Sequence, residues 1–173
     1  MDQDLLELET RVRFRYGEEG GAASRGDLRE LLAFRLANEE YALDIGVVEE
    51  IITPRPITEV PLTPDFILGL LSLRGRIVPV FDLRRRLSLA AAPLSRDSRI
   101  IIAAEGGRIA GLAVDGVSGV VRLPAAAIGP TPAVVGGTDA EFLAGLGRAD
   151  GRLLILLNLG RVLEFATDVE EAD

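Results

Sequence analysis

The side chains that most often perform nucleophilic, acid–base or metal chemistry are missing from this sequence. Its 173 residues include no His, Cys or Lys, so every basic side chain is an Arg. Without Cys there is no disulfide, thiolate nucleophile or thiolate metal site. Without His there is no imidazole base and no phosphohistidine relay. Without Lys there is no Walker-type phosphate loop and no Schiff-base nucleophile.

The remaining chemistry would have to come from Ser, Asp or Glu. Gly116-Val117-Ser118-Gly119 resembles a nucleophile elbow in spacing only, because no His can serve the serine, and a tight turn is favoured. The pairs Glu39-Glu40 and Glu49-Glu50 are typical of solvated faces, and a sugar cleft would need more aromatic side chains than two Tyr and no Trp. No Asp-x-Asp-x-Asp calcium loop occurs. We therefore expect no enzyme activity, no cofactor and no bound metal, and a binding module instead.

The net charge of −8 belongs to the ends of the chain. Residues 31–163 carry 14 acidic residues and 14 Arg, and the only basic run is Arg84-Arg85-Arg86, which favours a helix C-terminus over an anion site. A neutral body gives no footprint for nucleic acid. No segment has the length and apolarity of a membrane span, and the acidic start is unlike a signal peptide, so we expect a cytoplasmic protein that a partner recruits to any membrane.

The elements that must carry a binding site are short strands. Residues 30–45 alternate with period two around Asn38-Glu39-Glu40, which predicts a β-hairpin, and residues 46–52 fit a helical turn or a bent strand equally well. Two strands are expected to meet at Gly75, with Pro79 placing the second at a sheet edge or a bulge. Asp82 and Asn158 are expected to cap short helices.

An internal repeat organises these strands. Residues 66–87 shifted by 76 positions fall on 142–163 with eight of 22 identities and no gap, including Gly75-Arg76 on Gly151-Arg152. Short strands with Gly and Pro at their corners favour closed barrels. We therefore predict a flexible extension over residues 1–29, a domain over 30–165 and an acidic tail over 166–173. Within the domain, lobes over 30–92 and 93–150 are followed by a closing strand and helix.

The motifs across residues 30–165 resemble the CheW family of chemosensory adaptors. The specific signature is Leu73-Arg74-Gly75-x-Ile77-Val78-Pro79, with Val114-Asp115-x-Val117 and Gly145-Leu146-Gly147 behind it. Ser72 stands where that family usually has Asn.

The resemblance implies a mostly β fold of two SH3-like five-stranded β-barrel lobes packed side by side, with few short helices. It also implies a non-catalytic adaptor that couples the cytoplasmic tip of methyl-accepting chemoreceptors to the regulatory domain of a CheA-type histidine kinase, itself CheW-like. The expected receptor site is a groove between the lobes, with Val48, Glu50, Ile51, Arg74 and Val117 near it. Kinase contact is expected at barrel ends around Gly69 and Gly145. We further expect Val48 to be partly accessible and Arg74 to join a partner or the other lobe through a salt bridge.

Three other functions stay open at this point. The first is a regulatory CheW-like module of a non-flagellar chemosensory system, for gliding, pili or gene expression, which would share the fold and the surfaces. The second is a small-ligand β-barrel, which requires a deep pocket with converging polar groups. The third is a carboxylate enzyme that depends on a divalent metal.

Overall fold

The structure is a computed structural model that describes residues 27–132, 134–135 and 138–164. Residues 1–26 of the extension predicted over 1–29, and the acidic tail predicted over 166–173, lie outside the described residues; the described chain enters β1 at Leu28, so the predicted extension ends two residues too late. The strands are β1 (Leu28–Leu36), β2 (Glu39–Asp44), β3 (Val48–Ile52), β4 (Ile67–Leu73), β5 (Arg76–Asp82), β6 (Arg99–Glu105), β7 (Arg108–Val114), β8 (Gly116–Pro124), β9 (Ile128–Gly129), β10 (Val134–Val135), β11 (Thr138–Asp139), β12 (Leu143–Ala149) and β13 (Arg152–Leu157). The helical elements are α2 (Leu83–Arg86), α3 (Leu159–Val162) and the 3-10 turns η2 (Ile45–Val47), η3 (Ala125–Ala127) and η4 (Ala140–Phe142).

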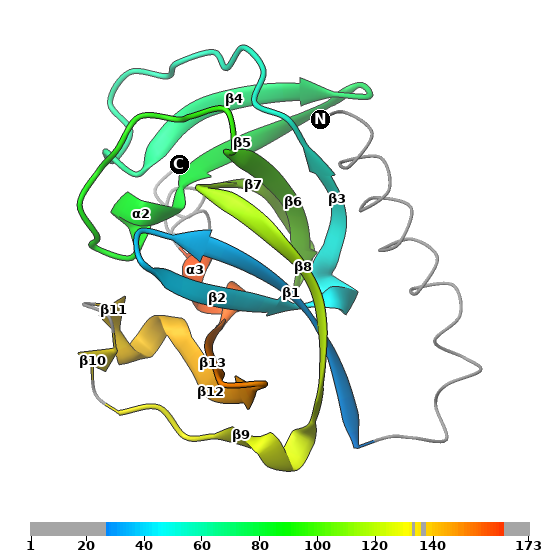
Figure 1. Cartoon of the computed structure of the whole chain (residues 1–173). Coiled ribbons are helices and arrows are strands. Elements are labelled where there is room, and N and C mark those ends of the chain that lie inside the picture. The colour runs from blue at the N-terminus through cyan, green and yellow to red at the C-terminus, as the bar shows by residue number, and fades with distance from the viewer. Residues whose placement is uncertain (1–26, 133, 136–137, 165–173) are drawn as a thin grey trace.

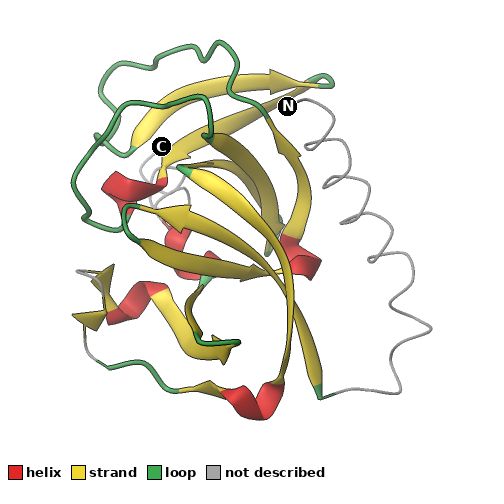
Figure 2. Ribbon diagram, viewed as in Figure 1, coloured by secondary structure: helices red, strands yellow, loops and turns green. Residues whose placement is uncertain are grey.

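Two curled sheets lie side by side and form the two lobes (Figure 1). The first has strand order β3-β6-β7-β5-β4, and the second has order β8-β1-β2-β13-β12-β9. Each sheet closes into a barrel because the chain that follows one edge strand, β3 or β8, returns to the opposite edge of the same sheet. The chain after β3 returns through a bridge between Thr58 and Leu70 on β4, and the chain after β8 returns as β9 beside β12. The prediction of a mostly β, two-lobe fold with few short helices is confirmed (Figure 2).

The strands of each lobe come from both halves of the chain. The β1–β2 hairpin joins the second sheet through parallel pairing of β2 with β13, and the β6–β7 hairpin joins the first sheet through parallel pairing of β7 with β5. The sequential division into lobes at residue 92 is therefore wrong. The first half of the chain places its β1–β2 hairpin in the second sheet, and the second half places its β6–β7 hairpin in the first sheet. The chain therefore crosses between the lobes and ties them together covalently.

The repeat in the sequence appears as matched local geometry. Gly75 and Gly151 have φ of 80° and 77°, and the residues before them, Arg74 and Asp150, both have φ of 51°. Two consecutive residues with positive φ form the tight two-residue hairpin turns whose twist matches that of the flanking strands. Asp82 and Asn158 both accept a hydrogen bond from the backbone N–H three residues later, as predicted for helix caps.

At Pro79, β5 has a ladder partner on one side only, β4, which agrees with the prediction of a sheet edge at this residue. The partner of Pro79 on β4 is Leu70, whose backbone groups bond to Thr58 instead. The backbone nitrogen of Pro79 therefore points toward β7, and the pairing of β5 with β7 begins one residue later, at Val80. No ladder hydrogen bond is lost at the proline.

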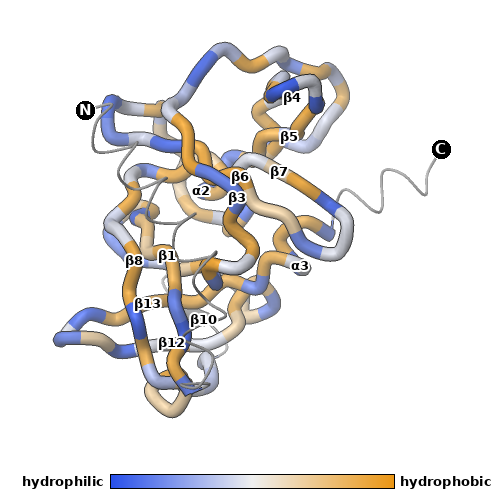
Figure 3. Tube along the Cα trace, turned by 90° about the vertical axis from the view of Figure 1, so that its right-hand side faces the viewer, coloured by the Kyte–Doolittle hydropathy of each residue, from blue (hydrophilic) through white to orange (hydrophobic). Residues whose placement is uncertain are grey.

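Three apolar clusters fill the structure. One lies inside the first lobe around Val78 and Ile100, and one inside the second lobe around Leu31 and Leu154. The largest joins strands of both sheets, from Phe34 to Leu112, and forms the core between the lobes. The tube in Figure 3 shows the hydrophobic residues concentrated in strands such as β5 and β7.

Arg86 of α2 joins the two lobes at the helices. Its guanidinium lies 4.6 Å from the ring centre of Phe66 and 4.8 Å from that of Phe142, which are equivalent residues of the two repeats. Its Nε donates a hydrogen bond of 2.9 Å to the carbonyl of Val162 on α3. One side chain thus contacts the same position of both repeats.

Candidate functional site

The predicted receptor groove contains two core residues. Val48 is 2% exposed and Ile51 is completely buried, and both belong to the apolar cluster between the lobes. A register shift between Val48 and Glu50 breaks the alternation of β3, so that four of its five residues face inward. The prediction that Val48 is partly accessible is wrong. Val48 and Ile51 are part of the buried core between the two lobes and do not reach its surface.

Glu50 and Arg74 form an ion pair within the first lobe. The Glu50 carboxylate is 3% exposed and lies 2.5 Å from a guanidinium nitrogen of Arg74 at the β4–β5 turn. The adjacent Glu49 pairs with Arg76 at 2.9 Å. These two acids of β3 hold both sides of the turn at Gly75. Of the two alternatives predicted for Arg74, a salt bridge to the other lobe is wrong, because its partner Glu50 belongs to the same barrel, and contact with a partner protein stays a prediction.

Val117 remains near the surface. It is half-buried on β8 and packs on the core between the lobes, as does Val120. These residues are three apart, yet a register shift beside Ser118 lets them face Phe34 and Leu32 on the same side. Val47 of η2 is also half-buried against this core, and η2 contacts β1. We call Val47, Val117 and Val120 the seam patch.

Val47 and Val120 were not among the site residues predicted from the sequence. Val47 stands next to the predicted Val48, and Val120 stands three residues after the predicted Val117; in each strand a bulge decides which residues face outward. Beyond a bulge, period-two alternation assigns each side chain to the wrong face of the strand. Only a sequence signal for the bulge would have identified Val47 and Val120 as half-buried. Gly119, with φ of 133°, is such a signal, because glycine inside a strand often marks one.

Gly69 and Gly145 are buried at the points where the two barrels close. A Cβ on Gly69, whose φ is 147°, would lie 2.2 Å from the carbonyl oxygen of Thr58. A Cβ on Gly145 would lie 2.9 Å from the side chain of Ile128 and 3.1 Å from the carbonyl oxygen of Gly129. Both glycines therefore let a returning strand approach, and neither offers a surface to a kinase.

The hairpins that contain these glycines do carry exposed apolar side chains. Ile77 on β5 is 62% exposed, and its repeat equivalent Leu153 on β13 is 38% exposed. Each lies two residues after the glycine of its hairpin turn. The two lobes thus present an apolar residue at the same position of the same hairpin.

Ion pairs set the electrostatics around the seam. Burial would raise the pKa of the Asp115 carboxyl, but hydrogen bonds from Arg84 and from the backbone N–H of Ala37 outweigh burial and lower it. The Arg84–Asp115 contact of 2.6 Å links α2 to the β7–β8 junction. In the second lobe, hydrogen bonds from Arg152 lower the pKa of Glu40.

Within the described residues, no group of three or more acidic side chains is arranged to hold a metal ion. The described helices include none of the length and apolarity that a membrane span requires.

A family model that describes the CheW-like domain matches residues 30–166, which span both barrels. The chain belongs to the CheW-like family. It is 40% identical to the chemotaxis protein CheW of Klebsiella aerogenes, over 78% of this chain and 81% of that protein. It is 35% identical to CheW of Rhizobium meliloti, over 83% of this chain and 92% of that protein.

A solved CheW structure shares the fold. The scaffolding protein TtCheW from Thermoanaerobacter tengcongensis superposes with a TM-score of 0.75 at 39% identity, over 79% of this chain and 92% of that one. The CheW-like match begins and ends within one residue of the domain predicted from the motifs.

Proposed function

We propose that this chain is a non-catalytic adaptor that couples chemoreceptors to a CheA-type histidine kinase in a bacterial chemosensory array. The observation that carries the proposal is the CheW-like match over nearly the whole described chain, together with apolar side chains at the seam patch and on the β4–β5 and β12–β13 hairpins. An adaptor needs two binding surfaces that can be occupied at once.

The seam patch is the proposed receptor surface. A receptor tip is a helical hairpin, and an amphipathic helix binds a groove through apolar side chains spaced along one face. Val117 and Val120 on β8 and Val47 on η2 are accessible enough to meet such side chains. Val48 and Ile51 act beneath them by fixing the positions of η2 and β3.

The β4–β5 and β12–β13 hairpins are the proposed kinase surfaces. Their exposed Ile77 and Leu153 replace the buried glycines of the original hypothesis. The kinase regulatory domain that the family resemblance implies is itself CheW-like. Similar barrels can therefore meet through similar hairpins, one at each end of the adaptor. The two hairpins belong to different lobes, so one adaptor can contact two kinase domains.

The proposal includes a cytoplasmic location and no turnover. The sequence has no His, Cys or Lys to serve as base, thiolate or amine nucleophile. The surfaces described above are apolar or paired in charge, which favours protein partners over nucleic acid. Contact with a membrane would come through the receptor, without direct insertion.

A pull-down from the native cell tests the function as a whole. The full chain with a C-terminal affinity tag is expressed at its natural level, and captured proteins are identified by mass spectrometry. The proposal predicts that a histidine kinase with a CheW-like domain and a methyl-accepting receptor are captured together. Capture of neither, or turnover of a phosphate or methyl group by the purified chain, would overturn it.

A further inference from the structure

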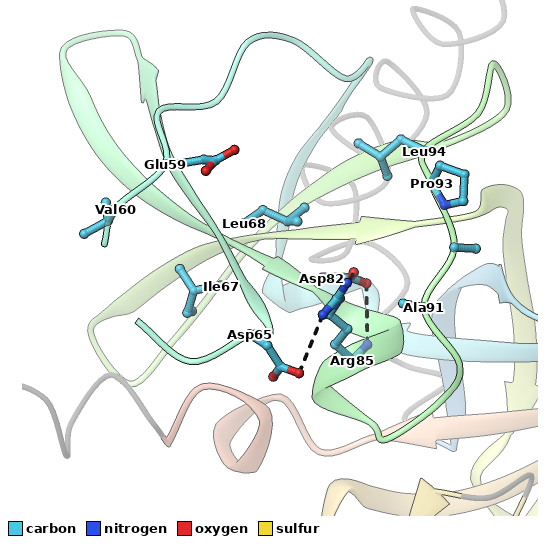
Figure 4. A pocket seen from close by; sticks show the side chains of 11 residues that line it. Glu59, Val60, Asp65, Ile67, Leu68, Asp82, Arg85, Ala91, Pro93 and Leu94 are labelled. Carbon is cyan, nitrogen blue, oxygen red and sulfur yellow. Dashed lines mark hydrogen bonds and ion pairs between the residues drawn. The ribbon is translucent and has the colours of Figure 1, made fainter. Parts of the chain in front are cut away.

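A groove on the first lobe lies away from the seam patch. It has a volume of about 570 Å³, within the usual range of ligand sites, and it runs between the loop before β4, helix α2 and the connection that leads to β6. Its floor is apolar, with Ile67 and Leu68 of β4 facing Pro93 and Leu94 (Figure 4).

Carboxylates dominate the edge of this groove. Glu59, Asp65 and Asp82 line it, and the one basic lining residue is Arg85. Arg85 lies 3.3 Å from Asp82 and 3.6 Å from Asp65, so its charge is already matched. The groove therefore has a net charge of −2 around an apolar floor. A ligand that fits it combines positive charge with apolar side chains.

Two large apolar side chains beside the groove are in water. Leu94 in its wall is 45% exposed, and Leu62 in the loop that supplies Glu59 and Asp65 is fully exposed. Leu62 also has a φ of 64°, which is uncommon for a residue with a branched side chain. An occupant of the groove would cover part of this apolar surface.

The chain contains one segment with the matching composition. Residues 11–16, which lie outside the described residues, read Arg-Val-Arg-Phe-Arg-Tyr and carry a charge of +3 with an apolar residue after each Arg, within a stretch (1–26) that has six acidic residues and four Arg. Ten residues, 17–26, separate this segment from Asp27. The carbonyl of Asp27 accepts a hydrogen bond from Ala125 at the end of β8 in the second lobe.

The position of this attachment favours binding between two molecules. In Figure 1 the start of β1 is at the bottom of the second lobe, whereas α2 and β4 are at the upper left in the first. Eleven peptide steps from Tyr16 to Asp27 span at most about 40 Å when fully extended. We infer that residues 11–16 of one copy bind the acidic groove of a second copy. Such a head-to-tail contact does not close on itself, so it can continue beyond two molecules.

The absence of Cys allows a direct test with the full chain. Two variants, Phe14→Cys and Leu94→Cys, each introduce the chain's only thiol. They are mixed under mild oxidation with one of them labelled in ¹⁵N, and disulfide dimers are identified by mass. The matched control replaces Leu94→Cys by Ile77→Cys, which is more exposed but lies outside the groove. The inference predicts about tenfold more mixed dimer with position 94 than with position 77.

Charge reversal separates specific binding from random collision. Arg11→Glu, Arg13→Glu and Arg15→Glu together are expected to reduce the mixed dimer to the control level, and Glu59→Arg in the partner is expected to restore part of it. Salt at about 1 M, where screening acts within about 3 Å, should have the same effect as the reversal.

Three results would overturn the inference. These are equal cross-linking at positions 94 and 77, cross-linking that survives the charge reversal, and a dilute Phe14→Cys/Leu94→Cys double variant that forms its disulfide within one molecule. Circular dichroism of each variant must match the parent chain, and sedimentation velocity of the parent without Cys must show mass that rises with concentration.

Discussion

Replacing Arg86 by Met tests how strongly the two lobes are joined. Met keeps an apolar stem of similar length but removes the charge and the hydrogen-bond donors. The parent guanidinium lies on Phe66 and Phe142 at 4.6 and 4.8 Å and donates to the Val162 carbonyl at 2.9 Å. Each ring contact contributes about 0.5–2 kcal/mol. A hydrogen bond from a charged group contributes about 1.5–3 kcal/mol.

The expected loss in the free energy of unfolding is smaller than that sum. Arg86 is half-buried, and contacts that share one side chain are not additive. We expect a loss of about 2–3 kcal/mol, which is a large part of the total stability of a domain. With a urea m-value of about 1.5–2 kcal/mol/M, the midpoint of urea unfolding should fall by roughly 1–2 M at unchanged m.

The matched control is Arg55→Met, which removes an exposed Arg from the loop after β3. Its expected effect is within about 0.5 kcal/mol. A double-mutant cycle with Phe142→Leu should give a coupling of about 0.5–2 kcal/mol between Arg86 and that ring. A loss at Arg86 no larger than at Arg55, or no coupling to Phe142, would refute the argument that Arg86 joins the lobes.

Three further changes test the local arguments. Gly69→Ala should lower the unfolding free energy by several kcal/mol, on the order of 3 or more, because its Cβ would collide with Thr58; a loss under about 1 kcal/mol in urea would contradict the barrel closure. Val48→Asp should leave the chain insoluble or unfolded by circular dichroism, since it places an unpaired charge in the core between the lobes, and a folded variant would show that this core yields. The lowered pKa of Asp115 means that its pairing with Arg84 stabilises the chain above about pH 4 and is lost as pH falls; the stability gap between the parent and Asp115→Asn should therefore shrink from about pH 7 to about pH 3, and a constant gap would exclude this linkage.

Local signals in the sequence were sufficient for the individual elements. The alternation over 30–45, the turn glycines at 75 and 151 and the caps at Asp82 and Asn158 each act within a few residues, and the structure has them where they were predicted. The repeat also indicated two similar barrels.

Pairing between distant strands was not predictable in this way. The two repeats carry equivalent hairpins, so the pattern alone cannot say whether β1–β2 pairs within its own half or with β13. Exposure at the site depended on register as well. A shift after Val48 buried the residue chosen for the groove, and a shift beside Ser118 brought Val117 and Val120 to one face. These bulges depend on the partner strand, which the resemblance to a family does not specify.

Two substitutions on separate surfaces test the coupling role most directly. Binding of the full chain to a receptor-tip fragment and to the kinase regulatory domain is measured by calorimetry for Val117→Asp and Ile77→Asp. Val117→Thr is the isosteric control. The account predicts that Val117→Asp weakens receptor binding by about 100-fold and leaves kinase binding unchanged, and that Ile77→Asp does the reverse. If both substitutions weakened the same partner, or neither weakened any, the assignment of two independent surfaces to this adaptor would be contradicted.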